Sequence, residues 1–182
     1  MSRLSDISLA TQVAVFGNKR AFDQLVRQYQ SPVRRFFLTQ TLGDEMLSDD
    51  LAQDTFIKAY THISQYRGTS GFLTWLTRIA YNVWYDYCRS DKEALRMDDA
   101  IKNSAFARTG AESGSPLSVD LLTALAQLRD DERTCITLQL IDGYQIDEIS
   151  EITRMPAGTV KSHLKRGKEK MANFLRQNGY DR

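Results

Sequence analysis

Apolar residues recur at intervals of three and four positions along almost the whole 182-residue chain. This is the spacing that places apolar side chains on one face of an α-helix. No stretch alternates apolar and polar residues for long enough to suggest a sheet, and proline occurs only three times. The pattern therefore predicts an all-α fold.

One segment interrupts the helical pattern. Residues Asn103 to Ser118 are rich in Ser, Gly and Ala and contain few large apolar side chains, a composition typical of a linker. We therefore expect two small helical domains, at residues 5–95 and 118–178, joined by a flexible linker at residues 96–117, with no internal repeat between them.

The first domain should contain at least three helices. Residues 21–39 have one apolar face and include Pro32, which predicts a bend or an interruption. The next helix should begin near Ser48, whose hydroxyl can cap it and which is followed by two aspartates suited to a first turn. A loop at residues 67–71, with two glycines, should lead into a long helix at residues 72–89.

The second domain has the pattern of a helix-turn-helix. Leucines from Leu121 onward are spaced to form one face of a helix. The next helix should stop at Gly143, because glycine is suited to the position just past a helix end. A short helix with three isoleucines then precedes a tight turn at residues 154–158 and a basic final helix.

The charges are separated within this second domain. The chain as a whole has 24 Lys and Arg against 23 Asp and Glu, so its total charge says nothing about nucleic acid. Residues 129–151 have a net charge of −5, however, whereas residues 154–176 have a net charge of +6. Such asymmetry indicates a surface directed at a polyanion.

The start of the final helix has the composition of a DNA-reading surface. If Val160, Leu164 and Met171 point inward, the opposite face and its flank contain hydroxyl, cationic and glycine residues suited to contact base edges and phosphates. These residues are Gly158, Thr159, Lys161, Ser162, Lys165 and Arg166. The alternative is a solvated basic helix without a ligand.

A second cluster is aromatic. Seven aromatic residues lie between Tyr66 and Arg89, with arginines among them. Stacking platforms next to cations suit single-stranded or melted DNA. The helix period places Trp75, Arg78, Asn82, Asp86 and Arg89 on the face away from the core. The alternative is that most of these rings are ordinary core.

The third cluster is acidic. Residues 44–54 contain five carboxylates, and no basic residue occurs between Phe36 and Lys58. Such a cluster repels DNA, so a basic protein partner is the preferred functional interpretation. Solvated decoration and metal-dependent catalysis are the alternatives, but no histidine or spaced third carboxylate completes a catalytic site.

Other chemistry is not expected from this sequence. Cys88 and Cys135 have no CxxC spacing, and only His62 and His163 accompany them, so we expect no metal site, no cofactor and no disulfide. The N-terminus lacks the pattern of a signal peptide, and no apolar run is long enough to insert into a membrane. We expect a cytoplasmic protein without catalytic residues.

Three blocks of the sequence resemble extracytoplasmic-function (ECF) sigma factors, members of the sigma-70 family. DDLAQDTFIKAY at Asp49–Tyr60 and YRGTSGFLTWLTRIAYNVWYDYCR at Tyr66–Arg89 are similar to regions 2.2 to 2.4 of these factors, and MPAGTVKSHLKRGKEKM at Met155–Met171 is similar to region 4.2. The resemblance extends from about Ala21 to Leu175. It implies a region 2 bundle and a region 4 helix-turn-helix that bind RNA polymerase core and promoter DNA.

The resemblance also assigns roles to residues. Binding to the core polymerase, through its β′ and β subunits, is implied for Asp49, Asp50, Leu51, Gln53, Asp54 and Phe56. Capture of the minus-10 element is implied for Tyr66, Arg67, Trp75, Arg78, Asn82, Asp86 and Arg89. Minus-35 recognition is implied for Gly158, Thr159, Lys161, Ser162, Lys165 and Arg166. An anti-sigma protein is the further partner that the resemblance implies.

The chain departs from the family pattern at three positions of the final helix. Pro156 replaces a serine that caps the helix, and His163 and Gly167 replace a common arginine and alanine. Two other functions compete with a sigma factor. A helix-turn-helix regulator of the response-regulator output type would explain only the second domain, and a metal-dependent nuclease would need the Asp49, Asp50 and Asp54 carboxylates.

Overall fold

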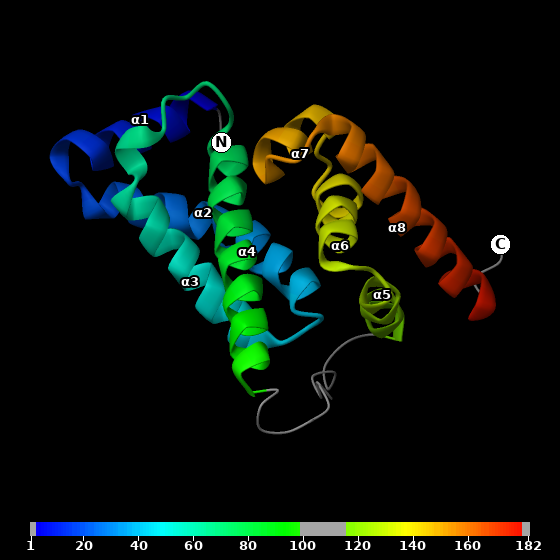
Figure 1. The fold of residues 1–182 in the computed structure, drawn as a ribbon. Coiled ribbons are helices and arrows are strands. Elements are labelled where there is room, and N and C mark those ends of the chain that lie inside the picture. The colour runs from blue at the N-terminus through cyan, green and yellow to red at the C-terminus, as the bar shows by residue number, and fades with distance from the viewer. Residues whose placement is uncertain (1–2, 99–115, 180–182) are drawn as a thin grey trace. The chain divides into compact units, whose positions relative to one another are not determined.

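The computed structural model describes residues 3–98 and 116–179, and every regular element in these ranges is helical (Figure 1). The predicted all-α class is therefore confirmed. The chain divides into two compact units, one of residues 1–33 and 49–109 and the other of residues 34–48 and 110–182. Most of the segment expected to be a linker lies outside the described residues; α4 ends at Asp98 and α5 begins at Pro116.

The first unit is built from helices packed around an apolar core. Its elements are α1 (Arg3–Phe16), most of α2 (Lys19–Gln40), most of α3 (Glu45–Thr61), the 3-10 turn η1 (Ile63–Gln65) and α4 (Phe72–Asp98). The helix α2 is continuous through Pro32, so the expected interruption does not occur. Among the most buried core side chains of this unit are Leu25, Val33, Phe72, Leu76 and Ala80.

The helix α3 begins three residues earlier than expected. Asp44 stands just before it, and its side-chain oxygen accepts a hydrogen bond from the Leu47 N–H at 3.0 Å. Ser48, the expected cap, is buried inside the helix, where its hydroxyl donates to the Asp44 carbonyl at 2.6 Å. The prediction of a Ser48 cap was therefore wrong, because an aspartate four residues upstream supplies the acceptor.

The second unit contains the predicted helix-turn-helix. Its elements are α5 (Pro116–Ala126), α6 (Asp130–Ile136), the π-helical turn η2 (Thr137–Ile141), α7 (Ile146–Thr153) and α8 (Ala157–Gln177). Gly143 follows η2 with a φ of +79°, as expected for the residue past a helix end. Arg154 ends α7 in the left-handed region, with a φ of +59°, and the turn to α8 is three residues long.

Residues 34–48 belong to this second unit and pack against α6 through buried polar groups. The Arg133 guanidinium donates to the Gln40 carbonyl at 2.9 Å, and the Thr134 hydroxyl donates to the Gln40 side-chain oxygen at 3.1 Å. The Gln40 amide nitrogen donates to the Thr137 hydroxyl at 3.2 Å. The fully buried Gln40 side chain is therefore paired at both ends, as burial requires.

Within the ranges that the structure describes, no helix is both long enough and apolar enough to cross a membrane.

Candidate nucleic-acid and protein interfaces

The predicted acidic surface lies on one face of α3. Asp49, Asp50, Gln53 and Asp54 are all exposed, whereas Leu51 is only 5% exposed and belongs to the core. The spacing explains this division, because positions 51, 55 and 59 follow one another by about one helical turn on the buried side.

The side chains that a partner can reach on this face are therefore three carboxylates and an amide, with Phe56 half-buried at their edge. Leu51 is buried in the core of its unit and is not accessible to a partner. In the part of the chain with described coordinates, no three acidic, histidine or cysteine side chains are grouped as metal ligands.

The loop between η1 and α4 is organised by aromatic rings. The Tyr66 hydroxyl donates to the Ser70 carbonyl at 3.1 Å, across the turn that contains Arg67. The ring of Tyr66 lies 5.1 Å from that of Phe72 and 5.5 Å from that of Trp75, centroid to centroid. Trp75 is half-buried, because two neighbouring rings cover one side of it, and its other side lies on the predicted face away from the core.

Four polar side chains continue from this loop along α4. Arg78, Asp86 and Arg89 are exposed, and Asn82 is half-buried. The Asp86 carboxylate pairs with Lys58 of α3, with an N–O distance of 3.5 Å and both side chains about half exposed. Such an exposed pair adds little stability. The predicted minus-10 residues thus form a stripe with cations toward both of its ends.

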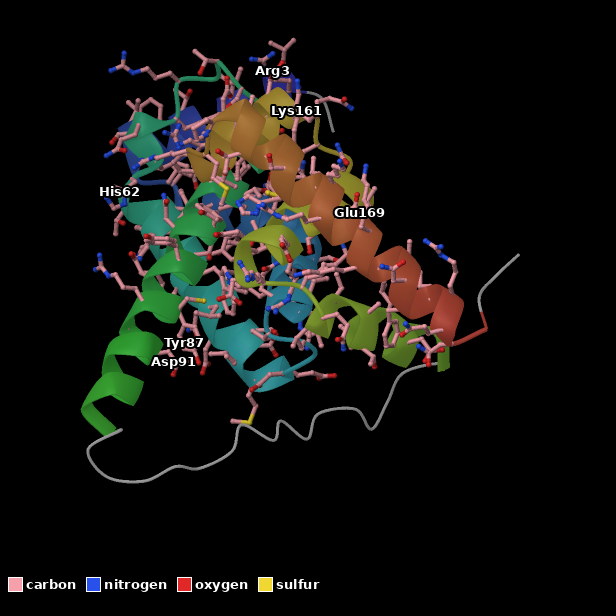
Figure 2. All side chains as sticks on the ribbon, turned by 45° about the vertical axis from the view of Figure 1, so that its right-hand side comes forward. Arg3, His62, Tyr87, Asp91, Lys161 and Glu169 are labelled. Atoms are coloured by element: carbon pink, nitrogen blue, oxygen red, sulfur yellow. The ribbon has the colours of Figure 1, made fainter. Side chains whose placement is uncertain are left out.

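The predicted reading face of α8 is solvent-exposed. The exposed residues are Gly158, Thr159, Lys161, Ser162, Lys165 and Arg166. Figure 2 shows Lys161 near the start of α8 and Glu169 farther along the same helix. Val160 and Leu164 are buried on the other side, and Met171 is half-buried. The predicted division between an inner and an outer face therefore holds at the start of the helix, where the reading face lies.

The first turn of α8 lacks a side-chain cap, as the proline at position 156 predicted. The Pro156 carbonyl instead accepts the N–H groups of Thr159 at 2.8 Å and Val160 at 3.0 Å. A Cβ atom added at Gly158 would meet nothing within 4 Å. The start of the helix is therefore open to the close approach of a ligand backbone.

Gly167 has a structural role that the sequence did not indicate. A Cβ atom at this position would lie 2.7 Å from Cγ1 of Ile136, a core residue of α6. Real Cβ atoms do not approach other atoms so closely, so glycine allows α6 and α8 to pack at this distance. Glycine in place of the family's common alanine therefore allows the close packing of α8 on α6.

Glu132 is a buried acid that sequence reasoning missed. It is 2% exposed, and its carboxylate accepts a hydrogen bond from the Lys170 ammonium at 2.6 Å and lies 3.4 Å from the Arg166 guanidinium. It also accepts the Arg129 N–H at 3.1 Å, as the third residue of a helix often does.

The pKa of Glu132 reflects these contacts. Burial alone would raise its pKa, but the hydrogen bonds from Lys170 and the Arg129 backbone, with the charges of Lys170 and Arg166, hold the pKa below its usual value. An ionised carboxylate therefore faces the basic helix, and it holds Arg166, one of the predicted DNA-binding residues, against α6. The sequence feature that could have pointed to Glu132 is its place as an acid at the third position of α6.

His163 also contacts Arg166. The Arg166 guanidinium lies 3.1 Å from Nδ1 of His163, one turn earlier on α8. Because a guanidinium can only donate, Nδ1 of His163 is the acceptor in this contact. Arg166 is thus oriented from two sides before any ligand binds.

Two family models match the chain. Residues 25–94 match sigma-70 region 2, and residues 118–171 match sigma-70 region 4. The first match lies in the first domain, which a response-regulator output domain left unexplained. The two matches include the α3 face, the α4 stripe and the α8 face.

Curated relatives match over nearly the full length. The RNA polymerase sigma-H factor of Pseudomonas aeruginosa is 31% identical, covering 87% of this chain and 88% of the relative. The ECF RNA polymerase sigma-E factor of Haemophilus influenzae is 31% identical over 95% and 96% of the two chains. The sigma-E factor of Escherichia coli is also 31% identical, over 86% and 87%.

Two solved structures share the fold. The sigma factor RpoE of Bartonella quintana, in complex with the anti-sigma factor NepR, has 25% identity and a TM-score of 0.74 over 88% of this chain and 98% of its own. CnrH, in complex with the cytosolic domain of CnrY, has 26% identity and a TM-score of 0.68 over 96% and 99%. The chain belongs to the ECF group of the sigma-70 family, the sigma factors that bind RNA polymerase core and direct promoter recognition and transcription initiation.

Proposed function

We propose that the chain divides promoter recognition among three of its surfaces. The exposed face of α3 binds the core polymerase, the Tyr66–Gly71 loop with the α4 stripe captures the minus-10 element, and the outer face of α8 reads the minus-35 element. The observation that carries this assignment is the exposed basic face of α8, placed directly after a helix-turn-helix turn.

The family matches support two functional domains. The matched ranges end at residue 94 and begin again at residue 118, and these inner bounds support the expected domains at residues 5–95 and 118–178. The compact units of the structure differ from these domains in placing residues 34–48 with the second unit. We propose that residues 96–117 connect them, and that the polymerase sets the separation at which the two domains meet DNA.

The α3 face is suited to a basic protein partner. Asp49, Asp50 and Asp54 are exposed on it, and the one basic residue of the helix, Lys58, pairs with Asp86. A row of carboxylates steers a cationic surface toward the helix and disfavours DNA. The coiled-coil helices of the β′ subunit are the partner that family membership supplies, and β subunit contacts complete the core interaction.

The loop and the α4 stripe are suited to unpaired bases. The half-buried Trp75 ring is braced by Tyr66 and Phe72, so its exposed part is a stiff surface on which a base can stack. Base stacking on an aromatic side chain contributes about 1–3 kcal/mol. Arg67, Arg78 and Arg89 are exposed nearby in sequence and can neutralise phosphates of the melted strand. Capture of unpaired bases then drives melting without any catalytic step by this chain.

The outer face of α8 is suited to the major groove of duplex DNA. Thr159 and Ser162 offer hydroxyls, and Lys161, Lys165 and Arg166 offer cations. An arginine that is already oriented pays less entropy when it contacts a guanine. Phosphodiester synthesis belongs to the polymerase, so we propose no enzymatic activity for the chain itself. The proposed task places it in the cytoplasm, where promoter DNA lies.

An anti-sigma protein is the further partner that we propose. RpoE of Bartonella quintana was solved with the anti-sigma factor NepR, and CnrH was solved with the cytosolic domain of CnrY. A protein that covers the α3 face would block core binding through the same carboxylates. Competition between such a protein and core polymerase for the purified chain would test this partner.

Transcription from a pool of random promoter fragments tests the assignment. Purified core polymerase should initiate specifically only when this protein is added. Asp54→Arg should reduce core binding and initiation by about tenfold or more, because it places a cation against a basic partner. Asp23→Arg, the same charge reversal at an exposed position of α2, is the matched control and should leave initiation unchanged.

The selected promoters provide the second arm of the test. Arg166→Ala should weaken holoenzyme binding by about tenfold and relax the sequence preference at one position of the minus-35 element. If Arg166→Ala left both affinity and preference unchanged, or Asp54→Arg bound core normally, the corresponding surface assignment would be wrong.

A further inference from the structure

The N-terminal helix α1 contacts the loop to which we assign minus-10 capture. The Arg3 guanidinium donates to the Gly68 carbonyl at 2.6 Å and also to the Thr69 carbonyl. Figure 1 shows the start of α1 close to the segment that leads into α4, and Figure 2 labels Arg3 beside the same loop. One charged side chain thus holds two consecutive loop carbonyls.

A second contact with α1, made by the Ile7 side chain, lies against the loop backbone at Gly68. Gly68 has a φ of +70°, and a Cβ atom added to it would lie 2.8 Å from Cδ1 of Ile7. The Ile7 side chain therefore occupies the space that a Cβ atom of residue 68 would take, and the positive φ at this position also favours glycine. Arg3 and Ile7 are about one helical turn apart, so they face the loop from the same side of α1.

The helix α1 is itself tied to the core of its unit by a buried acid. Asp6 is 5% exposed, and its carboxylate accepts hydrogen bonds from the Tyr29 hydroxyl at 2.7 Å and from the Gln28 amide at 3.3 Å. Burial and the hydrogen bond to Asp6 raise the pKa of Tyr29, so the phenol remains a proton donor. These bonds join α1 to α2.

The same elements meet the aromatic rings of the loop. The Tyr29 ring lies 5.3 Å from that of Phe72, which in turn contacts Tyr66 and Trp75. Burial, and then the charge of Asp6, raise the pKa of Tyr66, which keeps its hydroxyl a donor to the Ser70 carbonyl. The loop is thus held at one end by the Tyr66 side chain, through its hydroxyl and its ring contacts. At Gly68 and Thr69 it is held by α1.

We propose that α1 positions the minus-10 loop, and that Arg3 and Ile7 are positioning residues which hold the backbone at Gly68 and Thr69 in the shape that receives an unpaired base. This inference rests on the proposed role of the loop. A loop already held in its binding shape loses less conformational freedom when the base enters. The residues of α1 then affect base capture without touching DNA.

The test uses holoenzyme assembled with variant chains on the promoters selected above. The probe is a fork-shaped DNA in which the minus-10 segment of the non-template strand is unpaired. Arg3→Ala should weaken binding to this probe by about three- to tenfold. Affinity for core polymerase and for duplex DNA that contains only the minus-35 element should not change. Arg3→Lys, which keeps one donor and the charge, should recover part of the loss.

Two further measurements separate positioning from a general charge effect. Arg20→Ala removes a cation from an exposed N-terminal position of α2 and should leave fork binding unchanged. In the free protein, trypsin should cleave after Arg67 faster in Arg3→Ala than in the parent chain, because the loop loses its anchor. Equal thermal unfolding of the two chains would show that the effect is local.

The outcomes distinguish this inference from the proposed function. If Trp75→Ala weakens fork binding but Arg3→Ala does not, the loop captures DNA and α1 does not position it. The inference is also overturned if cleavage after Arg67 accelerates while fork binding stays unchanged. If neither Trp75→Ala nor Arg3→Ala alters fork binding, the minus-10 role of the loop is wrong, and the inference falls with it.

Discussion

At the scale of single residues, Gly167 shows how packing can outweigh helix propensity. Glycine in the middle of a helix costs about 1 kcal/mol relative to alanine, which makes the position look like a weakness of α8. The structure places Ile136 where a Cβ atom would go. Overpacking a buried contact costs about 1–3 kcal/mol. An added Cβ atom would therefore cost more in packing between α6 and α8 than it would gain in helix propensity.

Gly167→Ala should therefore lower the free energy of unfolding, by about 1 kcal/mol net of the gain in propensity. Gly158→Ala is the matched control, because it makes the same change in the same helix at a position with open space. Urea unfolding followed by circular dichroism measures both. A stability of Gly167→Ala equal to or above that of the parent chain would show that Ile136 yields without cost.

Glu132 makes a prediction about pH. Its pKa is lower in the folded protein than in the unfolded chain, since its partners outweigh its burial. The stabilisation is therefore fully present above the ordinary value of 4.5 and is lost as pH falls below that value through the folded-state pKa.

The measurement compares the parent chain with Glu132→Gln. At neutral pH the variant should be less stable by about 1–3 kcal/mol, because Lys170 and Arg166 lose a charged acceptor. The difference should shrink as the pH is lowered from 5 toward 3. Asp142, whose pKa is raised by burial, is present in both chains, so its opposite titration cancels. A gap that stays constant with pH would contradict the assignment to Glu132.

At the scale of elements, the helix-turn-helix was predictable and the start of α3 was not. The isoleucine spacing of α7, the turn and the inner face of α8 all follow from local sequence. The start of α3 depends on a competition between two capable caps, Asp44 and Ser48. The structure assigns the cap to Asp44 and buries Ser48 beside Thr41.

Asp44→Ala should destabilise the protein by about 1 kcal/mol, the usual effect of removing an N-terminal cap. Asp44→Asn, which keeps an acceptor oxygen, should retain most of the stability. Chemical denaturation of the three chains gives the comparison. Asp50→Ala removes another exposed carboxylate of α3 and serves as the control. An effect there as large as that of Asp44→Ala would show that Asp44 does not act as the cap.

At the scale of the whole molecule, neither charge nor either DNA surface alone explains promoter selection. The chain has a formal net charge of only +1, and the acidic face of α3 repels DNA. The two proposed DNA contacts lie in different domains, so they act together only when something fixes their separation. Joining two such contacts can raise affinity by about a hundredfold or more without any new interaction.

Free protein should accordingly bind a selected promoter at least about a hundredfold more weakly than holoenzyme at the same salt concentration. Fluorescence anisotropy with labelled promoter DNA, at several salt concentrations, measures both. The free chain should also show the shallower salt dependence, because it makes fewer phosphate contacts at once. Equal affinities would mean that the chain needs no polymerase to align its surfaces.

The sequence by itself determined the helical class, the helix-turn-helix, the outer face of α8 and the acidic face of α3. These features depend on periodicity and local charge, which a helix expresses without help from distant residues. Only the tertiary structure decided which side chains meet across the chain. Arg3 with Gly68, Glu132 with Lys170, and Gly167 with Ile136 each join positions at least 31 residues apart. No local pattern marks such pairs, because burial and close approach arise only when the helices pack.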